Sequence, residues 1–541
     1  MPSSIALMSR VGSVVIALVA MTAVWSTARI FSGTVDEPAH IAAGMQWLTS
    51  HRYDYDVVHP PIGRAAAVIG PYLHGARGTG ARAVYDEGAN ILGSGAHYRE
   101  TLALARHGEM IFLALLAFGI WLWGQRLLGE AGAALAVFLA LCDPNVLAHA
   151  GLATTDISCA AGTVLALYCA MRWLEQPTNA RSVAFGLALG LAIASRFSAI
   201  AFVGASVVVW YVARGFVARR WRLATDATVR ATSGTCATVL ACCALVIWTA
   251  YRFAVGRVHP GGMLIPAPGF MLGVSRFLLH GDSGHPSFLL GRPSNHGWWY
   301  YFPVAVLVKV PLPILALATV GAVTALRRMR AYVNWVSATP ILSALAMLAV
   351  SMTVKVDLGI RLVLPMLPMV AIVAAQGARE LWRRGGSAGA IAAAALVVWT
   401  GIIPVHEYPD YLAYFNRLAG DHPEHVLVDS NLDWGQDLYR LRDTIIARGI
   451  QDSVRIAYFG TADPTATGLP RARALGLHER ATGWIAASET YLAGEWVGNA
   501  YAWLLDYPSV ARIGPSMRLW HIPDMAPEAP APLVTRDSLR R

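Results

Sequence analysis

Two neighbouring carboxylic acids, Asp36 and Glu37, follow the first long apolar run of the chain, in the sequence TVDEPAH (34–40). Pro38 favours the first turn of a helix, because its missing N–H would be unpaired there. We therefore expect a helix to begin at Pro38, and its dipole would keep both acids ionised. Such an acid can act as a general base or bind a metal ion, for which the predicted ligands are Asp36, Glu37 and His40.

Other chemistry for this acid pair is less consistent with the spacing. A zinc protease motif would place a histidine before Glu37, and none is present. Adjacent residues point in different directions, so the two acids would not flank a sugar ring as a glycosidase pair does. The structural alternative is that both acids only cap the helix and complement its dipole.

The helix after Pro38 carries apolar residues at helical spacing. Ile41, Met45 and Leu48 recur in this way, with Trp47 beside them. This pattern predicts a helix that lies in the plane of a membrane interface. A second helix is expected to begin at HPPIGR (59–64), again with proline at its start.

The composition is that of a membrane protein. Of the 541 residues 56% are hydrophobic and 14% are charged, whereas soluble domains average about 25% charged residues. Several apolar runs approach the roughly 20 residues that cross a bilayer, and we interpret the first as a retained span. The sequence predicts about eleven spans, at 10–30, 108–128, 131–149, 155–173, 182–195, 198–214, 232–252, 300–320, 335–352, 359–377 and 388–405.

The formal charge of +10 is concentrated in linkers between spans. The positive-inside rule makes arginine-rich linkers cytoplasmic, so the charge indicates membrane orientation rather than nucleic-acid binding. With a cytoplasmic amino terminus, the loops 31–107 and 253–298 and the chain from 406 face outward. We interpret 182–214 as a hairpin of two spans with Arg196 at its turn. The clusters are Arg214/Arg219/Arg220/Arg222, Arg327/Arg328/Arg330 and Arg379/Arg383/Arg384.

The predicted fold is therefore mainly α, with a polytopic transmembrane domain (1–405), a small extracytoplasmic α/β domain (406–525) and a loose tail (526–541). Alternating elements in the second part support the α/β interpretation. Strands are expected at 425–429, 454–459 and 483–488, and a helix at 438–449.

Further ionisable residues stand near the predicted outer ends of spans, where charged groups usually face a cavity or a partner. Each also has a simpler explanation. Arg361 could pair with Asp357 at i, i+4, Lys309 could extend to the membrane surface, and Arg196 could be an ordinary loop residue. Their common location on one side favours a shared site. The set is Asp143, Asp156, Arg196, Lys309, Asp357 and Arg361.

Taken in order, these motifs resemble the phospholipid-carrier-dependent glycosyltransferases of the GT-C superfamily, near the protein O-mannosyltransferase and aminoarabinose-transferase group (glycosyltransferase family 39-like). The resemblance covers most of 10–440, although His59 stands where the aminoarabinose branch usually has a lysine. It implies a lipid-linked sugar donor, an acceptor arriving from outside, Asp36 as catalytic base and Glu37 as its helper. The motifs are DEPAH, HPP, TTD, GWWYYFPVAVLVKVPLP, GIRLVLPMLP and DSNLDWGQDL.

A sugar on a polyprenyl phosphate already has a good leaving group, which needs cations rather than an acid. No cofactor is required by this scheme, although a divalent metal is possible. The expected partners are a polyprenyl-phosphate sugar donor, membrane lipid and a protein or glycolipid acceptor at the cell membrane. The predicted substrate- and phosphate-binding residues are His59, Arg64, Asp156, Arg196, Lys309 and Arg361.

Two other functions fit parts of the sequence. A multi-span transporter of a lipid-linked or anionic substrate would also carry buried charges and proline-broken spans. It is disfavoured because no repeated half is evident and 31–107 is a long outer loop. A membrane receptor could use the C-terminal part to bind a ligand, but it gives no reason for the first-loop acids.

Overall fold

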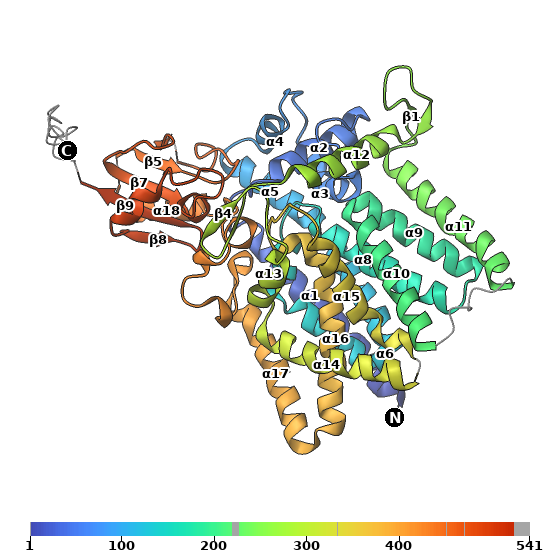
Figure 1. Ribbon diagram of the computed structural model, residues 1–541. Coiled ribbons are helices and arrows are strands. Elements are labelled where there is room, and N and C mark those ends of the chain that lie inside the picture. Colours follow the sequence, from blue (N-terminus) through green and yellow to red (C-terminus); the bar gives the residue numbers. More distant parts are fainter. Residues whose placement is uncertain (1, 219–226, 333, 451, 470, 524–541) are drawn as a thin grey trace, which may run out of the picture.

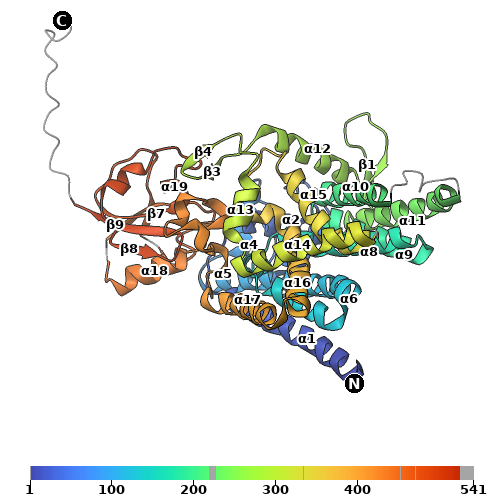
Figure 2. The ribbon, with the colours of Figure 1, turned by 60° about the horizontal axis from the view of Figure 1, so that its bottom comes forward.

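The computed structural model describes residues 2–218, 227–332, 334–450, 452–469 and 471–523. Within these ranges, eight helices are long and apolar enough to cross a membrane, and shorter apolar helices lie at Asn179–Ser195 and Trp335–Ser351. The chain is thus a multi-pass membrane protein. Figures 1 and 2 show the helical part on one side and the C-terminal strands on the other.

The long helices of the bundle follow most of the predicted spans. The hairpin expected around Arg196 is confirmed, because α9 ends at Ser195 and α10 begins at Ser198. The helices are α1 (Pro2–Thr27), α6 (Met110–Leu141), α8 (Asp156–Glu175), α9 (Asn179–Ser195), α10 (Ser198–Ala218), α11 (Ala227–Ala250), α14 (Leu312–Tyr332), α15 (Thr339–Ser351), α16 (Leu367–Arg384) and α17 (Gly386–His406).

Helix α6 reverses direction at Gly129, whose backbone has φ 78° and ψ −178°. A Cβ on Gly124 would lie 2.9 Å from the Cα of Ala133, whereas nine residues of straight helix span about 13.5 Å. The predicted boundary between spans near residue 129 is therefore confirmed. The single span predicted at 131–149 is wrong, because α7 (Pro144–Ala150) starts a separate helix capped by Asp143.

The span predicted at 300–320 is also wrong. Helix α13 (Tyr301–Lys309) ends early, and Val310 is extended with ψ 136°. The cause is Pro311, since the residue before a proline is forced away from helical geometry. Helix α14 begins after it, at Leu312.

The described arginines of the three clusters share one end of the bundle. Arg328 and Arg384 both contact Glu380, at 2.8 and 3.2 Å. The Arg214 guanidinium lies 5.7 Å from the ring of Trp335, which follows α14. Arg361 precedes the opposite end of α16, an 18-residue helix about 27 Å long. Arg219, Arg220 and Arg222 lie outside the described residues.

The first loop folds into α2 (Glu37–Ser50), α3 (Pro61–Leu73), α4 (Val84–Leu92) and α5 (Gly95–Gly108). Both helix starts expected at prolines are confirmed to within one or two residues. The prediction that the first of these helices lies in the membrane interface stays a prediction, but the apolar residues on which it rests pack inside the protein. Ile41 and Met45 are buried in a core that they share with Leu438 and Val454 of the C-terminal part.

The segment between α11 and α13 forms short hairpins and one helix. The elements are β1 (Val255–Gly256), β2 (Ile265–Pro266), α12 (Pro268–Ser283), β3 (Ser287–Leu289) and β4 (Arg292–Ser294). Helix α12 packs next to the turn between α9 and α10, through Phe197, Phe270 and Phe277.

The C-terminal part carries a five-stranded mixed sheet in the order β6-β5-β7-β9-β8. Strand β5 is parallel to β6 and β7, and β9 is antiparallel to β7 and β8. The expected strands at 454–459 and 483–488 and the helix at 438–449 are confirmed. The elements are β5 (Val454–Ala457), β6 (Ala472–Ala474), β7 (Gly483–Ser488), β8 (Ala511–Ile513), β9 (Met517–Ile522), α18 (Leu438–Ala447) and α19 (Glu489–Leu492).

The strand predicted at 425–429 is wrong, because the chain forms the 3-10 turns η5 (Pro423–His425) and η6 (Asp429–Asn431). Asp429 has φ 53°, which no strand allows. Side chains here bond to the segment before α16: Ser430 Oγ donates to Leu358 O at 3.0 Å, and Ile360 N–H donates to Asn431 Oδ1 at 3.0 Å. The tail predicted at 526–541 lies outside the described residues.

Candidate active site

Asp36 and Arg361 form an ion pair, although 325 positions separate them in the sequence. Arg361 Nη1 lies 2.7 Å from Asp36 Oδ2, and the side chains are 8% and 24% exposed. Asp36 occupies the N-cap position of α2 but makes no capping hydrogen bond with its side chain. Its carboxylate therefore faces Arg361 rather than acting as the helix cap that the structural alternative required.

Arg361 lies in the 3-10 helix η2 (Ile360–Met366) and is held by backbone and ring contacts. Its Nε donates to Leu358 O at 3.2 Å, and its guanidinium lies 4.2 Å from the ring centroid of Trp434, a cation–π arrangement. The alternative pairing with Asp357 is wrong, because Asp357 Oδ2 accepts a hydrogen bond from Trp298 N–H at 2.6 Å.

A cavity of about 400 Å³ opens beside this ion pair. Its polar lining includes Asp36, Arg196 and Arg361, together with the imidazoles of His59, His280 and His285. The remaining wall is largely apolar and comes from α10, α12, α13, α15 and the segment before α16. Large apolar members are Phe202, Phe277, Leu278, Phe302, Val350 and Val354.

Arg196 reaches the cavity from the turn between α9 and α10. It forms an ion pair with Asp156, the first residue of α8, whose other oxygen accepts a hydrogen bond from Thr154 Oγ1 at 2.8 Å. Asp156 also interacts electrostatically with Arg361, so it links the two arginines. Asp156 itself is buried and does not line the cavity.

Glu37 is turned away from the cavity and is fully buried. Its two oxygens accept hydrogen bonds from Arg106 Nε at 2.8 Å and Nη2 at 2.7 Å, and from the N–H groups of Thr34 and Ala153. Burial alone would raise the pKa of Glu37, but Arg106 and these N–H donors lower it below its usual value. This contact joins the first loop to α5 and to the segment before α8.

Arg64 is buried beneath the first loop rather than in the cavity lining. Its Nη1 donates to Tyr53 Oη at 2.9 Å and to Asp56 O at 2.6 Å, and its Nη2 pairs with the Asp56 carboxylate. Arg64 thus shapes the segment that carries His59, whose Nδ1 lies 3.2 Å from Asp56 Oδ2. His59 itself lines the cavity, as predicted, whereas Arg64 does not.

The three predicted metal ligands point to different partners. Asp36 faces Arg361, Glu37 faces Arg106, and His40 Nδ1 accepts a hydrogen bond from Arg64 Nε at 2.9 Å. Burial and the Arg64 charge lower the pKa of His40 well below its usual value. Within the ranges that the structure describes, no group of three His, Cys, Asp or Glu residues is placed to hold a metal ion.

Lys309 at the end of α13 is buried and lies outside the cavity lining. Its Nζ donates to Leu412 O at 2.8 Å and to Asn431 O at 2.6 Å. The ammonium group therefore ties α13 to the start of the C-terminal part.

Sequence reasoning did not single out several residues that shape the site. Arg106 binds Glu37, Trp434 stacks on Arg361, and His280 and His285 line the cavity. For Arg106, the signal was an arginine at the start of an apolar run. Trp434 lies in the DSNLDWGQDL motif, but Arg361, which stacks on its ring, is 73 positions away in the sequence. Local sequence patterns therefore could not predict this contact.

Comparisons with known proteins agree with this architecture. Residues 99–248 match the family model of the dolichyl-phosphate-mannose-protein mannosyltransferases. Two structures of ArnT from Cupriavidus metallidurans, one bound to undecaprenyl phosphate and one apo, each share 16% sequence identity with the chain. Each alignment covers 94% of this chain and 97% of ArnT, with a TM-score of 0.51.

A second fold relative is the oligosaccharyltransferase of Archaeoglobus fulgidus, solved with a tethered acceptor peptide. It is 11% identical, the alignment covers 92% of this chain and 72% of that one, and the TM-score is 0.50. No curated protein matches the sequence. The predicted resemblance is confirmed at the level that these matches reach: the chain shares the fold of ArnT, and residues 99–248 match the mannosyltransferase family model.

Proposed function

We propose that this chain, a multi-pass membrane protein with the GT-C glycosyltransferase fold, transfers a sugar from a polyprenyl-phosphate donor to an acceptor hydroxyl on a protein or an envelope glycolipid. The observation that carries the proposal is the Asp36–Arg361 ion pair in the lining of a mostly apolar cavity. One carboxylate and two arginines there combine a proton acceptor with an anion-binding surface.

The cavity suits an amphipathic donor. Its apolar wall fits a prenyl chain, and Arg196 and Arg361 can make charge-assisted hydrogen bonds to a phosphate. The ArnT structure with undecaprenyl phosphate supports this choice of donor. Arg64 and Lys309 face protein groups, so we assign them to holding the site together rather than to the phosphate.

In the proposed transfer, Asp36 takes the proton of the acceptor hydroxyl, and the oxygen bonds to the anomeric carbon of the sugar. The bond from that carbon to the phosphate oxygen breaks, and its electron pair leaves with the polyprenyl phosphate. The phosphate gains one negative charge, which Arg361 and Arg196 stabilise. The departing charge and the proton thus go to different groups of the same cavity.

The contact between Asp36 and Arg361 also suggests how the base becomes available. Arg361 Nη1 donates a hydrogen bond to Asp36 Oδ2, so this oxygen is already engaged before a substrate arrives. A donor phosphate competes for the same guanidinium, which offers five N–H donors. Donor binding would then weaken the hold of Arg361 on Asp36 and prepare the carboxylate for the acceptor proton.

The proposed orientation rests on the arginine clusters. Their described members lie at the end of the bundle opposite Arg361, and the positive-inside rule favours a cytoplasmic location for that end. We therefore place Asp36, the cavity and the sheet on the outer side of the cell membrane.

The direct test uses the purified protein in nanodiscs with a panel of undecaprenyl-phosphate-linked, radiolabelled hexoses and an envelope extract as acceptor. We expect label to move from the lipid to the extract, with equal release of undecaprenyl phosphate. No label transfer with any donor, together with donor-independent movement of substrate across proteoliposomes, would instead identify a transporter.

A further inference from the structure

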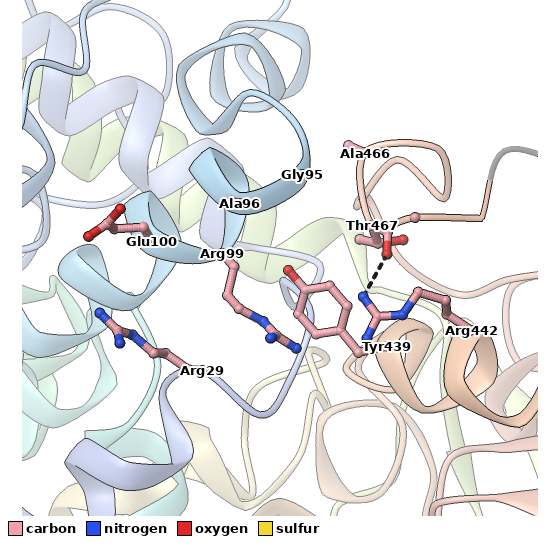
Figure 3. A pocket seen from close by; sticks show the side chains of 10 residues that line it. Arg29, Gly95, Ala96, Arg99, Glu100, Tyr439, Arg442, Ala466 and Thr467 are labelled. Atoms are coloured by element: carbon pink, nitrogen blue, oxygen red, sulfur yellow. Dashed lines mark hydrogen bonds between the residues drawn. The ribbon is translucent and has the colours of Figure 1, made fainter. Parts of the chain in front are cut away.

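A second cavity, of about 520 Å³, lies between the first-loop helices and the C-terminal part (Figure 3). It shares no lining residue with the cavity at Asp36. One wall comes from α5 and the segment after α1, and the other from α18 and the turn at 466–468. The N–H of Gly95 donates to Ala466 O at 2.9 Å, which fixes the two walls together.

Three arginines line this second cavity from three elements. Arg29 stands two residues beyond the end of the α1 span at Thr27, Arg99 lies in the first turns of α5, and Arg442 lies on α18. The position of Arg29 places the cavity near the depth at which the apolar part of α1 ends. A bound group would therefore sit near the boundary between lipid and water.

The positive charge in this cavity is only partly neutralised. Among the described residues, Arg29 and Arg99 take part in no ion pair. Arg442 pairs with Asp443, which is not part of the lining. The acidic lining residue Glu100 lies 3.5 Å from His74 and, in Figure 3, points away from Arg99.

Tyr439 lies between two of these arginines. Figure 3 shows its ring next to the Arg99 and Arg442 side chains. The ring centroid is 4.5 Å from the Arg99 guanidinium and 5.1 Å from that of Arg442. The side chain is 4% exposed. Its hydroxyl is buried beside the Arg99 guanidinium, which can only donate to it, and its own O–H has no acceptor among the described residues. A buried O–H donor without an acceptor is costly, and a ligand oxygen in this cavity would accept from it.

We propose that this second cavity binds a phosphate group presented at the membrane surface, the head group of an anionic lipid. Arg29 and Arg99 would pair with the phosphate oxygens, and Tyr439 would donate its hydroxyl. Arginine matches phosphate through parallel N–H groups, and basic residues beside a span attract anionic lipid. The proposal does not depend on the transfer reaction, because it concerns binding alone.

The test measures binding of dioctanoyl phosphatidic acid to the full-length protein in neutral detergent, by microscale thermophoresis. Dioctanoyl glycerol, which lacks the phosphate, is the matched ligand control. We expect phosphatidic acid to bind more tightly than the glycerol lipid. Arg29→Gln and Arg99→Gln should each weaken binding roughly tenfold, the loss of about one charge-assisted hydrogen bond, and Tyr439→Phe should weaken it a few-fold.

Arg82→Gln is the matched protein control, since Arg82 is an exposed first-loop arginine outside this lining. It should bind phosphatidic acid as the parent does, and melting curves should show all variants folded. Unchanged affinity in a folded Arg29→Gln/Arg99→Gln double variant would overturn the proposal, as would binding lost only in Arg361→Ala. Inorganic phosphate is the second arm: if it binds as tightly with the same arginine dependence, the lipid source is wrong and the phosphate site stands.

Discussion

Asp36 and Glu37 are neighbours in the sequence but belong to two different regions of the molecule. Asp36 lines the cavity, is 24% exposed and shares its carboxylate with Arg361. Glu37 is completely buried, and its carboxylate is occupied by Arg106 and backbone N–H groups. Consecutive residues of a helix are rotated by about 100°, so the first turn of α2 presents one acid to the cavity and the other to the protein interior.

The difference separates two uses of a carboxylate. Removing one partner of a buried, fully hydrogen-bonded ion pair typically costs about 3–5 kcal/mol, because the other charge is left without compensation. A partly exposed pair contributes far less to stability, and its carboxylate can exchange partners. We therefore expect Glu37 variants to affect folding and Asp36 variants to affect transfer.

The largest expected effect is in Asp36→Asn. The amide keeps the size of the side chain but cannot take the acceptor proton, and general base catalysis contributes roughly 10²–10⁴-fold. Sugar transfer per folded molecule should fall by about that factor in the nanodisc assay, while donor binding and the melting temperature stay near the parent values. Normal turnover in the folded variant would exclude Asp36 as the base.

Glu37→Gln should act mainly on folding. The new amide would direct N–H groups at the Arg106 guanidinium or at backbone N–H donors, so a buried cation loses its counter-charge. We expect a loss of about 3–5 kcal/mol in the free energy of unfolding, seen as lower abundance and a lower melting temperature. Molecules that do fold should transfer sugar far better than Asp36→Asn. Equal loss of turnover per folded molecule in both variants would mean that the two acids act as one unit.

The lowered pKa of Glu37 predicts that the stability of the protein depends on pH. Because the pKa of Glu37 is lowered in the folded protein, its stabilising contribution is present above the unfolded pKa, near 4.5, and is lost as the pH falls through the folded value. The melting temperature of the parent should therefore drop more steeply below about pH 4.5 than that of Glu37→Gln. Parallel curves would show that the Glu37–Arg106 contact does not contribute to acid stability.

A smaller effect is expected from Arg361, where Arg361→Ala should weaken donor use by roughly tenfold or more, the loss of one or more charge-assisted hydrogen bonds. Arg361→Lys should lose less because it keeps the charge, but it lacks the planar pair of donors and the stacking on Trp434. Donor-dependence curves for the two variants decide this order. Identical curves for alanine, lysine and the parent would remove Arg361 from the phosphate site.

Local sequence rules succeeded where neighbouring residues set the structure. Proline placed the starts of α2 and α3, and the strand pattern placed β7 over its full length. They failed where the conformation or the pairing of a residue depends on a partner that is distant in the sequence. The segment 425–429 reads as a strand, but Asp429 adopts a left-handed backbone and its neighbours bond to the segment before α16. A local i, i+4 rule likewise pairs Arg361 with Asp357 instead of Asp36.

The sequence by itself determined that this is a membrane protein, because apolar content and run length depend only on composition and order. It also identified Asp36 as a candidate, since an acid directly after the first span can be recognised without knowledge of the fold. The tertiary structure decided what each charge does. Asp36 meets Arg361 across 325 positions, and Glu37 meets Arg106 across 69. Hydrogen bonds act over about 3 Å in space, so only the folded chain determines which carboxylate remains open to a substrate and which one holds the protein together.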